Sequence, residues 1–440
     1  MKPLYKTFLI IVLVFLFLLF LRFVIRSAVS RRVEQRNNFL QNIFDRFGKN
    51  QQSENEGVNG VNVPENVPTV DCADGSCQEI AVNGDPKYAF PNGTASPFSG
   101  YADPSIRRDP HTDMLWMAYS WPHFKIEGTT RSPSSEIHLA KSDDDGQSWT
   151  FVKKLWETTA LSNPAKTTQS GYLDYEVVNL LPVDMNGATT WFAVTLNYFV
   201  PSDGGFAARP SNSFHIRVSK SSTVEGLSNA PAQVLGGGMT ATQWNVNQTL
   251  VPSDIGAFDK KSFFWNEPSL YYENGTLYLT MVAFNVRNRS DITRDGVYVF
   301  GTKPDGDPST WNWSYKGKLA GSNEASELGG QRLTQVDIAR GVNGQLLMIT
   351  SPDDWSSTFS DYNHKGCVAL EVASMEQPAL ARDENGQLVV HARVTDSTAN
   401  ALGSAACSYD PSNSGGILFT RRNKTQTELT AGIWKTFLNP

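Results

Sequence analysis

From Phe90 onward, the sequence alternates between short apolar runs and clusters of turn residues. The runs are rich in β-branched and aromatic residues and have the length of single strands, and long stretches with apolar residues at helical spacing are absent. Asn-Gly pairs, which favour tight hairpins, stand at 274–275, 343–344 and 385–386. Examples of the runs are MLWMAYSW, EIHLAKS, TWFAVTLNYF, LYLTMVAFN, GVYVFGT and GILFTRR. The body of the chain is therefore predicted to be all-β.

The runs group into units that open in a similar way. Each unit begins with a short motif, continues through a hairpin and ends on a polar turn. An interval of about 50 to 90 residues between openings is typical of propeller blades with insertions. We predict a five-bladed β-propeller over residues 86–440, with six blades as the alternative. The openings are 101–105 (YADPS), 173–176 (LDYE), 265–269 (WNEPS), 334–338 (TQVDI) and a fifth near 389–392 (VVHA).

The N-terminus contains an apolar run at residues 8–25, interrupted only by Arg22. This length is about the minimum that spans a bilayer. We predict that residues 1–30 form a cytoplasmic tail and a transmembrane signal-anchor. A cleaved signal peptide is the alternative, because Ala28–Ser30 resembles a cleavage site. More Lys and Arg follow the run than precede it, which by the positive-inside rule alone favours a cytoplasmic body.

Residues 31–85 are polar and contain no Trp, so they are predicted to form a solvated stalk. Residues 1–36 hold seven Lys or Arg and one Glu, a net charge of +6, and the remainder therefore carries −12 of the total of −6. This acidic body argues against nucleic acid as a partner. A single-pass membrane protein with an extracytoplasmic propeller is expected, or a secreted one if the N-terminus is cleaved.

An even number of cysteines without a C-x-x-C motif is consistent with two disulfides in an oxidising compartment, one of which would close the loop between Cys72 and Cys77. Four unrelated thiols are the alternative. The cysteines are Cys72, Cys77, Cys367 and Cys407. The six His lack metal-ligand spacing, so no metal or other cofactor is expected from the residues. The N-x-S/T sequons, consistent with a glycoprotein, are at Asn92, Asn247, Asn274, Asn288, Asn312 and Asn423.

One motif matches S-x-D-x-G-x-[ST]-W, the Asp box, at every fixed position: Ser142, Asp144, Gly146, Ser148 and Trp149. The Asp144 carboxylate can accept hydrogen bonds from turn amides, and Gly146 can adopt a positive φ. The Trp149 ring can bury itself between strands. The motif is therefore predicted to close a hairpin between the outer strands of one blade.

With these motifs, the chain resembles the propeller glycosidases from about residue 90 to 440. The Asp box resembles those of sialidases and related proteins, although sialidases usually have several and this chain has one. The openings YADPS and NEPS and the hairpin LYYENGTLYL resemble glycoside hydrolase family 43 and its relatives in clan F.

The clan F resemblance implies roles for particular acids. Asp103, at the start of blade 1, matches the general base, and Glu267, at the start of blade 3, matches the general acid. Asp174 or Glu176 would supply a blade 2 carboxylate that tunes the acid. Glycoside hydrolysis needs such a pair, and crowded like charges raise one pKa. The alternative is that these acids only cap turns at strand starts.

Other residues are candidates for binding the substrate. Asp337 could bind sugar hydroxyls, and Trp121 and Trp355 could form an aromatic rim. The clan F resemblance also allows a structural Ca²⁺ ion in the propeller axis, with His364 nearby. A sialidase would need several arginines around a substrate carboxylate. The candidates for that role are Arg107, Arg108, Arg332, Arg340, Arg421 and Arg422.

The leading hypothesis is a glycoside hydrolase that acts on an extracytoplasmic glycan. The alternatives are an exo-sialidase-like hydrolase and a non-catalytic propeller that binds a glycan or a protein. A hydrolase requires Asp103 and Glu267 to face one site, whereas a binding propeller leaves them in turns.

Overall fold

The computed structural model describes residues 66–127, 130–163, 166–203, 214–237, 246–253, 263–285, 291–354, 364–398, 401–424 and 429–440. The predicted transmembrane segment and most of the predicted stalk lie outside these residues. Within the described ranges, no helix is both long and apolar enough to cross a membrane.

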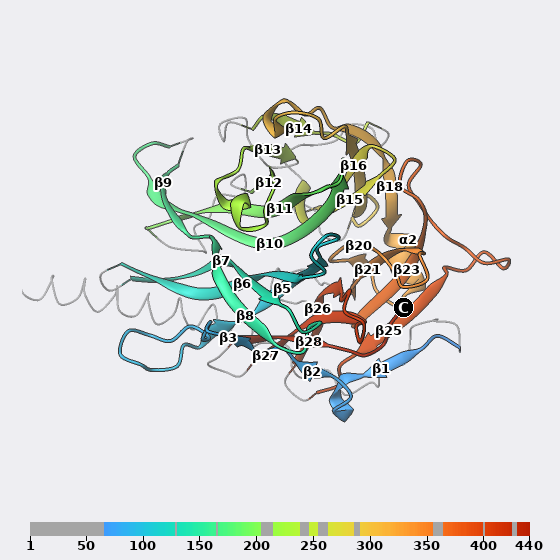
Figure 1. The fold of residues 1–440 in the computed structure, drawn as a ribbon, viewed down its shortest axis with the longest axis horizontal. Coiled ribbons are helices and arrows are strands. Elements are labelled where there is room, and N and C mark those ends of the chain that lie inside the picture. The colour runs from blue at the N-terminus through green and yellow to red at the C-terminus, as the bar shows by residue number, and fades with distance from the viewer. Residues whose placement is uncertain are drawn as a thin grey trace, which may run out of the picture. The chain divides into compact units, whose positions relative to one another are not determined.

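Five sheets follow one another along the chain and form the blades of a propeller (Figure 1). Blade 1 consists of β5 (Ala102–Arg108), β6 (Leu115–Glu127), β7 (Thr130–Ser142) and β8 (Trp149–Trp156). Blade 2 consists of β9 (Thr159–Ser162), β10 (Ser170–Met185), β11 (Ala188–Pro201), β12 (His215–Ser221), β13 (Ala232–Gly237) and β14 (Gln248–Leu250). Blade 3 consists of β15 (Phe263–Glu273), β16 (Thr276–Asn285), β17 (Gly296–Thr302) and β18 (Ser314–Gly321).

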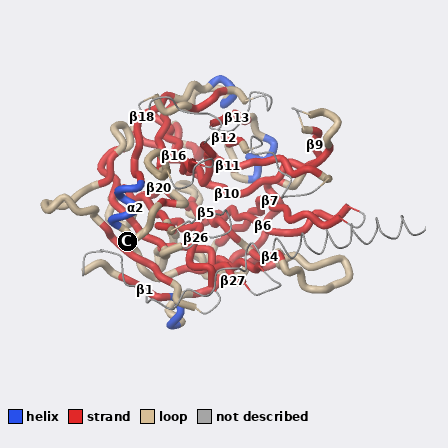
Figure 2. The backbone as a smooth tube through the Cα atoms, turned by 180° about the vertical axis from the view of Figure 1, so that it is seen from behind, coloured by secondary structure: helices blue, strands red, loops and turns tan. Residues whose placement is uncertain are grey.

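Blade 4 consists of β20 (Asp337–Arg340), β21 (Leu346–Thr350), β23 (Cys367–Ser374), β24 (Ala379–Leu380) and β25 (Val390–Thr395). Blade 5 consists of β26 (Ala401–Tyr409), β27 (Ile417–Lys424) and β28 (Leu429–Lys435). A small two-stranded sheet pairs β19 (Arg332–Leu333) with β22 (Pro352–Asp353). Helical structure in the described residues is limited to α2 (Ser322–Glu327) and the 3-10 turns Cys72–Asp74, Glu225–Asn229 and Pro308–Thr310 (Figure 2).

The prediction of five blades is confirmed, but the position of the fifth opening is wrong. The run at 389–392 belongs to β25, an outer strand of blade 4, and blade 5 begins with β26 at Ala401. Inner and outer strands differ in their pairing partners, which the sequence does not give. In Figure 1 the inner strands β5, β10, β15, β20 and β26 lie nearest the common centre.

Neighbouring sheets pack face to face through apolar side chains. The run TWFAVTLNYFV forms β11, which is buried along most of its length because sheets cover both of its faces. Between blades 1 and 2, the Trp116 and Trp191 rings meet edge to face with centroids 6.5 Å apart. This interleaved packing fixes the angle of each blade to the next.

Residues 69–83, which their composition placed in the stalk, are part of the propeller; we call them the N-terminal strap. Its strand β1 (Thr69–Asp71) pairs with β25, β2 (Gln78–Glu79) with β28, and β3 (Val82–Asn83) with β8. A further edge strand, β4 (Phe98–Gly100), also pairs with β28. The strap therefore joins blades 4, 5 and 1 across the seam between the last and first blades. Strands of two or three residues are too short to show a period of two in the sequence.

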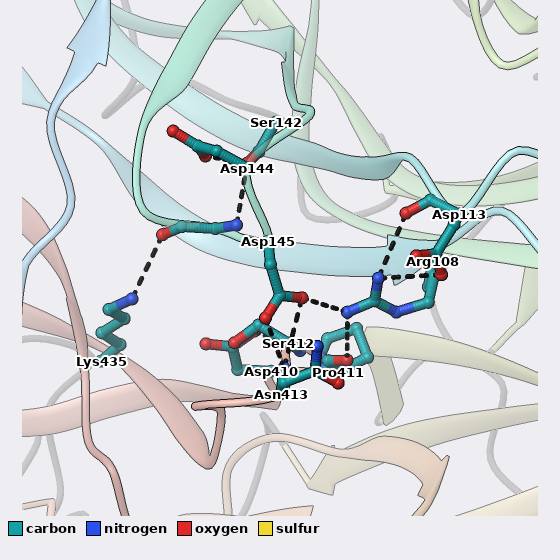
Figure 3. Close-up of polar contacts among 11 residues, drawn as sticks. Arg108, Asp113, Ser142, Asp144, Asp145, Asp410, Pro411, Ser412, Asn413 and Lys435 are labelled. Carbon is teal, nitrogen blue, oxygen red and sulfur yellow. Dashed lines mark hydrogen bonds and ion pairs between the residues drawn. The ribbon is translucent and has the colours of Figure 1, made fainter.

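The Asp box lies between β7 and β8, the outer strands of blade 1. The Asp144 carboxylate accepts hydrogen bonds from the Ser142 hydroxyl at 2.7 Å and the Ser148 amide at 2.9 Å. Trp149 is buried. The turn also contacts blade 5: the Asn413 amide donates to Asp145 at 3.0 Å and Lys435 Nζ donates to the Gly146 carbonyl at 3.1 Å (Figure 3). The turn thus adds polar contacts to the seam that closes the ring.

Two disulfides are present, as predicted. Cys72 bonds to Cys77 within the strap, and Cys367 of β23 bonds to Cys407 of β26. The second disulfide links blade 4 to blade 5. A cavity of about 550 Å³ lies beside the strap, lined by residues 79–87 and Tyr101. None of the four predicted catalytic acids lines it.

Candidate functional site

The inner strands of four blades share an irregularity. The pairing register breaks in β5, β10, β15 and β26. At each break one residue adopts left-handed backbone, namely Asp103 (φ 51°), Val177 (φ 50°), Glu267 (φ 47°) and Ala406 (φ 52°). A bulge of this kind redirects a side chain, and for a non-glycine residue it is strained. Asp103 and Glu267 therefore occupy the same structural place in blades 1 and 3.

Two residues beyond the bulge, a polar side chain binds the next blade. In blades 1 to 3 this side chain accepts a hydrogen bond from a backbone amide of the following inner strand, and in blade 4, where β20 has no bulge, Asp337 at the start of the strand does the same. The four bonds are Leu180 N to Ser105 Oγ (2.9 Å), Leu270 N to Asn179 Oδ1 (3.0 Å), Ile338 N to Ser269 Oγ (3.1 Å) and Tyr409 N to Asp337 Oδ2 (2.9 Å). Because the bonds hold the inner strands in register around the axis, the bulged residues converge.

Electrostatic interactions join Asp103, Glu176, Glu267 and Arg422, which we call the axial carboxyl cluster. Burial raises the pKa of Glu267 well above its usual value, and the charges of Asp103 and Glu176 raise it further. Arg422 and Asn266 offset this in part. Burial also raises the pKa of Asp103, against the lowering effects of Arg422 and of a hydrogen bond with Ser120. Burial thus favours the protonated form of both acids, and for Glu267 the charges of two neighbouring carboxylates add to this effect.

Asp103 is held by a neighbouring blade as well as by its own. Its backbone amide donates to Thr420 Oγ1 of β27 at 3.0 Å. Arg422 lies two residues beyond Thr420 on the same strand, in blade 5. The composition of β27 does not show which of its two adjacent arginines faces the cluster, and the sequence therefore left Arg422 among many candidates.

The two candidate carboxylates of blade 2, Asp174 and Glu176, lie in different surroundings. Val177 occupies the bulged position in this blade, so the third carboxylate of the cluster comes from Glu176, one residue earlier. Asp174 is fully buried near Thr158 and Ser134, and the largest effects on the pKa values of Asp103 and Glu267 come from other groups. Burial raises the pKa of Asp174 to about 7, partly offset by Thr158 and Ser134.

The raised pKa of Asp174 predicts a stability that falls as pH rises. The folded protein binds this proton more tightly than the unfolded chain, so ionisation of the unfolded state favours unfolding from about pH 4 up to about pH 7. Asp174→Asn removes this penalty. We expect the variant to unfold with a free energy on the order of 1–3 kcal/mol higher than wild type at pH 7.5, and to match wild type at pH 4. Chemical denaturation at both pH values checks this, and an equal difference at both would contradict it.

Asp337 and Arg107 were predicted to bind substrate, but the structure pairs them with each other. Arg107 Nη2 lies 2.5 Å from Asp337 Oδ1, and both side chains are almost fully buried. Asn179 Nδ2 donates to the same oxygen at 2.8 Å. Their contacts come from blades 1, 2 and 4, so the pair joins inner strands at the axis.

Four of the other arginines proposed for a sialidase site are also paired with protein carboxylates, and the last, Arg422, acts on Asp103 and Glu267. The buried Arg332 pairs with Asp295, so its charge is neutralised within the fold. Arg108, Arg340 and Arg421 pair with Asp145, Glu273 and Asp396. The described residues therefore supply no converging set of arginines for a substrate carboxylate.

Trp121 lies directly after Ser120 on β6, half-buried. Its ring stacks on His138 with centroids 4.7 Å apart, and its indole nitrogen donates to the Pro86 carbonyl at 3.3 Å. Trp355 lies outside the described residues. His364 pairs with Asp353 at 2.8 Å, and the described residues contain no metal-ligating cluster of His, Cys, Asp or Glu. The possible axial Ca²⁺ ion stays a prediction.

No protein-family model matches the sequence, and no curated protein matches it. Solved structures do resemble this fold. A family 117 glycoside hydrolase from the marine bacterium Zobellia galactanivorans is 13% identical, with 82% of this chain and 90% of that chain covered and a TM-score of 0.45. A Cellvibrio cellulosa α-L-arabinanase mutant is 13% identical (76% and 90% covered, TM-score 0.43). The catalytic domain of a Coprinopsis cinerea family 62 α-L-arabinofuranosidase is 12% identical (82% and 97% covered, TM-score 0.41). At such identities these likenesses assign no role to any residue of this chain.

Proposed function

We propose that this protein is a glycoside hydrolase whose reaction takes place at the axial carboxyl cluster. The observation that carries the proposal is the electrostatic difference between two acids at equivalent bulges. Glu267 is buried beside the charges of Asp103 and Glu176, which hold its proton. Arg422 favours the ionised form of both acids, and a hydrogen bond with Ser120 favours the ionised form of Asp103. Two acids whose environments separate their pKa values are what acid and base catalysis require.

In this mechanism Glu267 donates its proton to the glycosidic oxygen as the bond to the anomeric carbon breaks. Asp103, in its ionised form, acts on the other side of the sugar, either by activating water or by attacking the anomeric carbon. Glu176 contributes its negative charge, which favours the protonated form of Glu267. Arg422 limits the repulsion among the three carboxylates.

We further propose that the substrate is a glycan outside the cytoplasm and that the N-terminal apolar run anchors the protein in a membrane. The support is the oxidation of all four cysteines to disulfides, which persist in oxidising compartments. The run at residues 8–25 supports the anchor by its length.

The full chain, purified in detergent, should release the aglycone from at least one member of a panel of aryl pentosides and hexosides of both anomeric forms. Asp103→Asn should lower kcat/KM by about 10³-fold or more for every aglycone, because the base or nucleophile is needed whatever the leaving group. Glu376→Gln, at an exposed position, is the control and should match wild type. Carbohydrate binding without turnover of any substrate would instead support the non-catalytic propeller.

A further inference from the structure

Ser120 lies on β6 beside the bulge that presents Asp103, opposite Ala102 in the strand register. It is 1% exposed. Its hydroxyl contacts two parts of the proposed site. It accepts a hydrogen bond from the Val177 amide of blade 2 at 3.1 Å, and it shares a hydrogen bond with the Asp103 carboxylate of its own blade.

The two contacts determine the direction of the hydroxyl proton. A serine hydroxyl has one proton to donate and two lone pairs that accept. Because the Val177 N–H occupies a lone pair, the proton is free to point at the ionised Asp103 carboxylate. Val177 directly follows Glu176, so the same hydroxyl also fixes the backbone that carries the blade 2 carboxylate.

We propose that Ser120 is a positioning residue that orients the Asp103 carboxylate and ties it to the backbone bearing Glu176. The inference rests on the proposed function and adds to it a neutral residue that no motif singles out. The charged groups that act on Asp103 come from other strands: Arg422 from β27 and Glu267 from β15. Ser120 is a neutral contact that links the Asp103 carboxylate of blade 1 to the blade 2 backbone next to Glu176.

Ser105 provides a matched control. It is also a serine of blade 1 that is 1% exposed, and it also accepts a blade 2 amide, Leu180 N at 2.9 Å. Its hydroxyl lies two residues beyond the bulge and is not among the groups that act on Asp103. Ser105→Ala therefore leaves one backbone amide without its acceptor, as Ser120→Ala does. Unlike Ser120→Ala, it removes no hydrogen bond to the Asp103 carboxylate.

The test measures kcat and KM from pH 4 to 9 for wild type, Ser120→Ala, Ser120→Cys and Ser105→Ala, with thermal unfolding to verify folding. Loss of the hydrogen bond raises the pKa of Asp103, so the base stays protonated to higher pH. We expect Ser120→Ala to lower kcat about 10- to 100-fold with KM within about twofold of wild type. The acid limb of its pH profile should move to higher pH.

Ser120→Cys keeps a side chain of similar size but with a weak donor. The acid limb of its pH profile should also move to higher pH. Ser105→Ala should keep the wild-type limb. An unmoved limb in either Ser120 variant, or equal losses in Ser120→Ala and Ser105→Ala, would overturn the role of Ser120 while the hydrolase assignment stands. A wild type without turnover on any glycoside would overturn both.

Discussion

Glu267→Gln is expected to lower turnover by about 10²- to 10⁴-fold on substrates with a poor leaving group, such as alkyl glycosides or disaccharides. The amide has the shape of the acid but no acidic proton that it can transfer to the departing oxygen. For aryl glycosides whose phenol is strongly acidic, departure needs no such proton, so the loss should be much smaller. Steady-state kinetics on a series of leaving groups measures this dependence.

Asp103→Asn is the comparison for that series, because its loss should not depend on the leaving group. The alkaline limb of the wild-type profile should report Glu267, whose pKa burial and the neighbouring carboxylates raise. That limb should disappear in Glu267→Gln. If Glu267→Gln loses the same factor on every substrate, Glu267 is not the proton donor.

Asp337→Asn should destabilise the propeller by about 3–5 kcal/mol, because it leaves the buried Arg107 without a countercharge. Asp337 also accepts hydrogen bonds from Asn179 and the Tyr409 amide, so the variant weakens contacts between several inner strands. Urea denaturation of wild type and variant measures the difference. The surface pair of Lys316 and Glu376 gives a contrast, since Glu376→Gln should cost less than about 1 kcal/mol.

A second variant separates the lost countercharge from lost packing. Arg107→Met combined with Asp337→Asn removes both charges, so it should be less destabilised than Asp337→Asn alone. A double variant as unstable as the sum of the two single variants would show that the ion pair itself contributes little. Asp337→Asn within about 1 kcal/mol of wild type would exclude the structural role that we assign to this pair.

Much of the fold can be predicted from the sequence because strands and hairpins depend on local residue patterns. Apolar runs bounded by Asn-Gly pairs became strands and hairpins, as at Asn274 between β15 and β16. The acids Asp103 and Glu267 stand at strand starts in the sequence and at equivalent bulges in the structure. The N-terminal strap was missed because strands of two or three residues carry no periodicity, and their pairing partners lie far along the chain.

The sequence predicted that the candidate site contains acids from the blade openings, but not which of these acids act on one another. The sequence offered Asp174 and Glu176 as equal candidates, and they differ only in what surrounds them: Asp174 faces blade 1 hydroxyls, and Glu176 acts on Glu267. Ser120 carried no signal, because nothing local distinguishes a serine that contacts a carboxylate from any other buried serine.

By itself, the sequence determined the all-β architecture, the repeat of blades and the presence of acids at their openings, since each follows from residue types at short spacing. Only the tertiary structure decided which charges neutralise one another and which stay available for chemistry. Arg107 and Asp337 are 230 residues apart and form one ion pair at the axis. Coulomb interactions and burial depend on distances between blades, and those distances arise only when the ring closes.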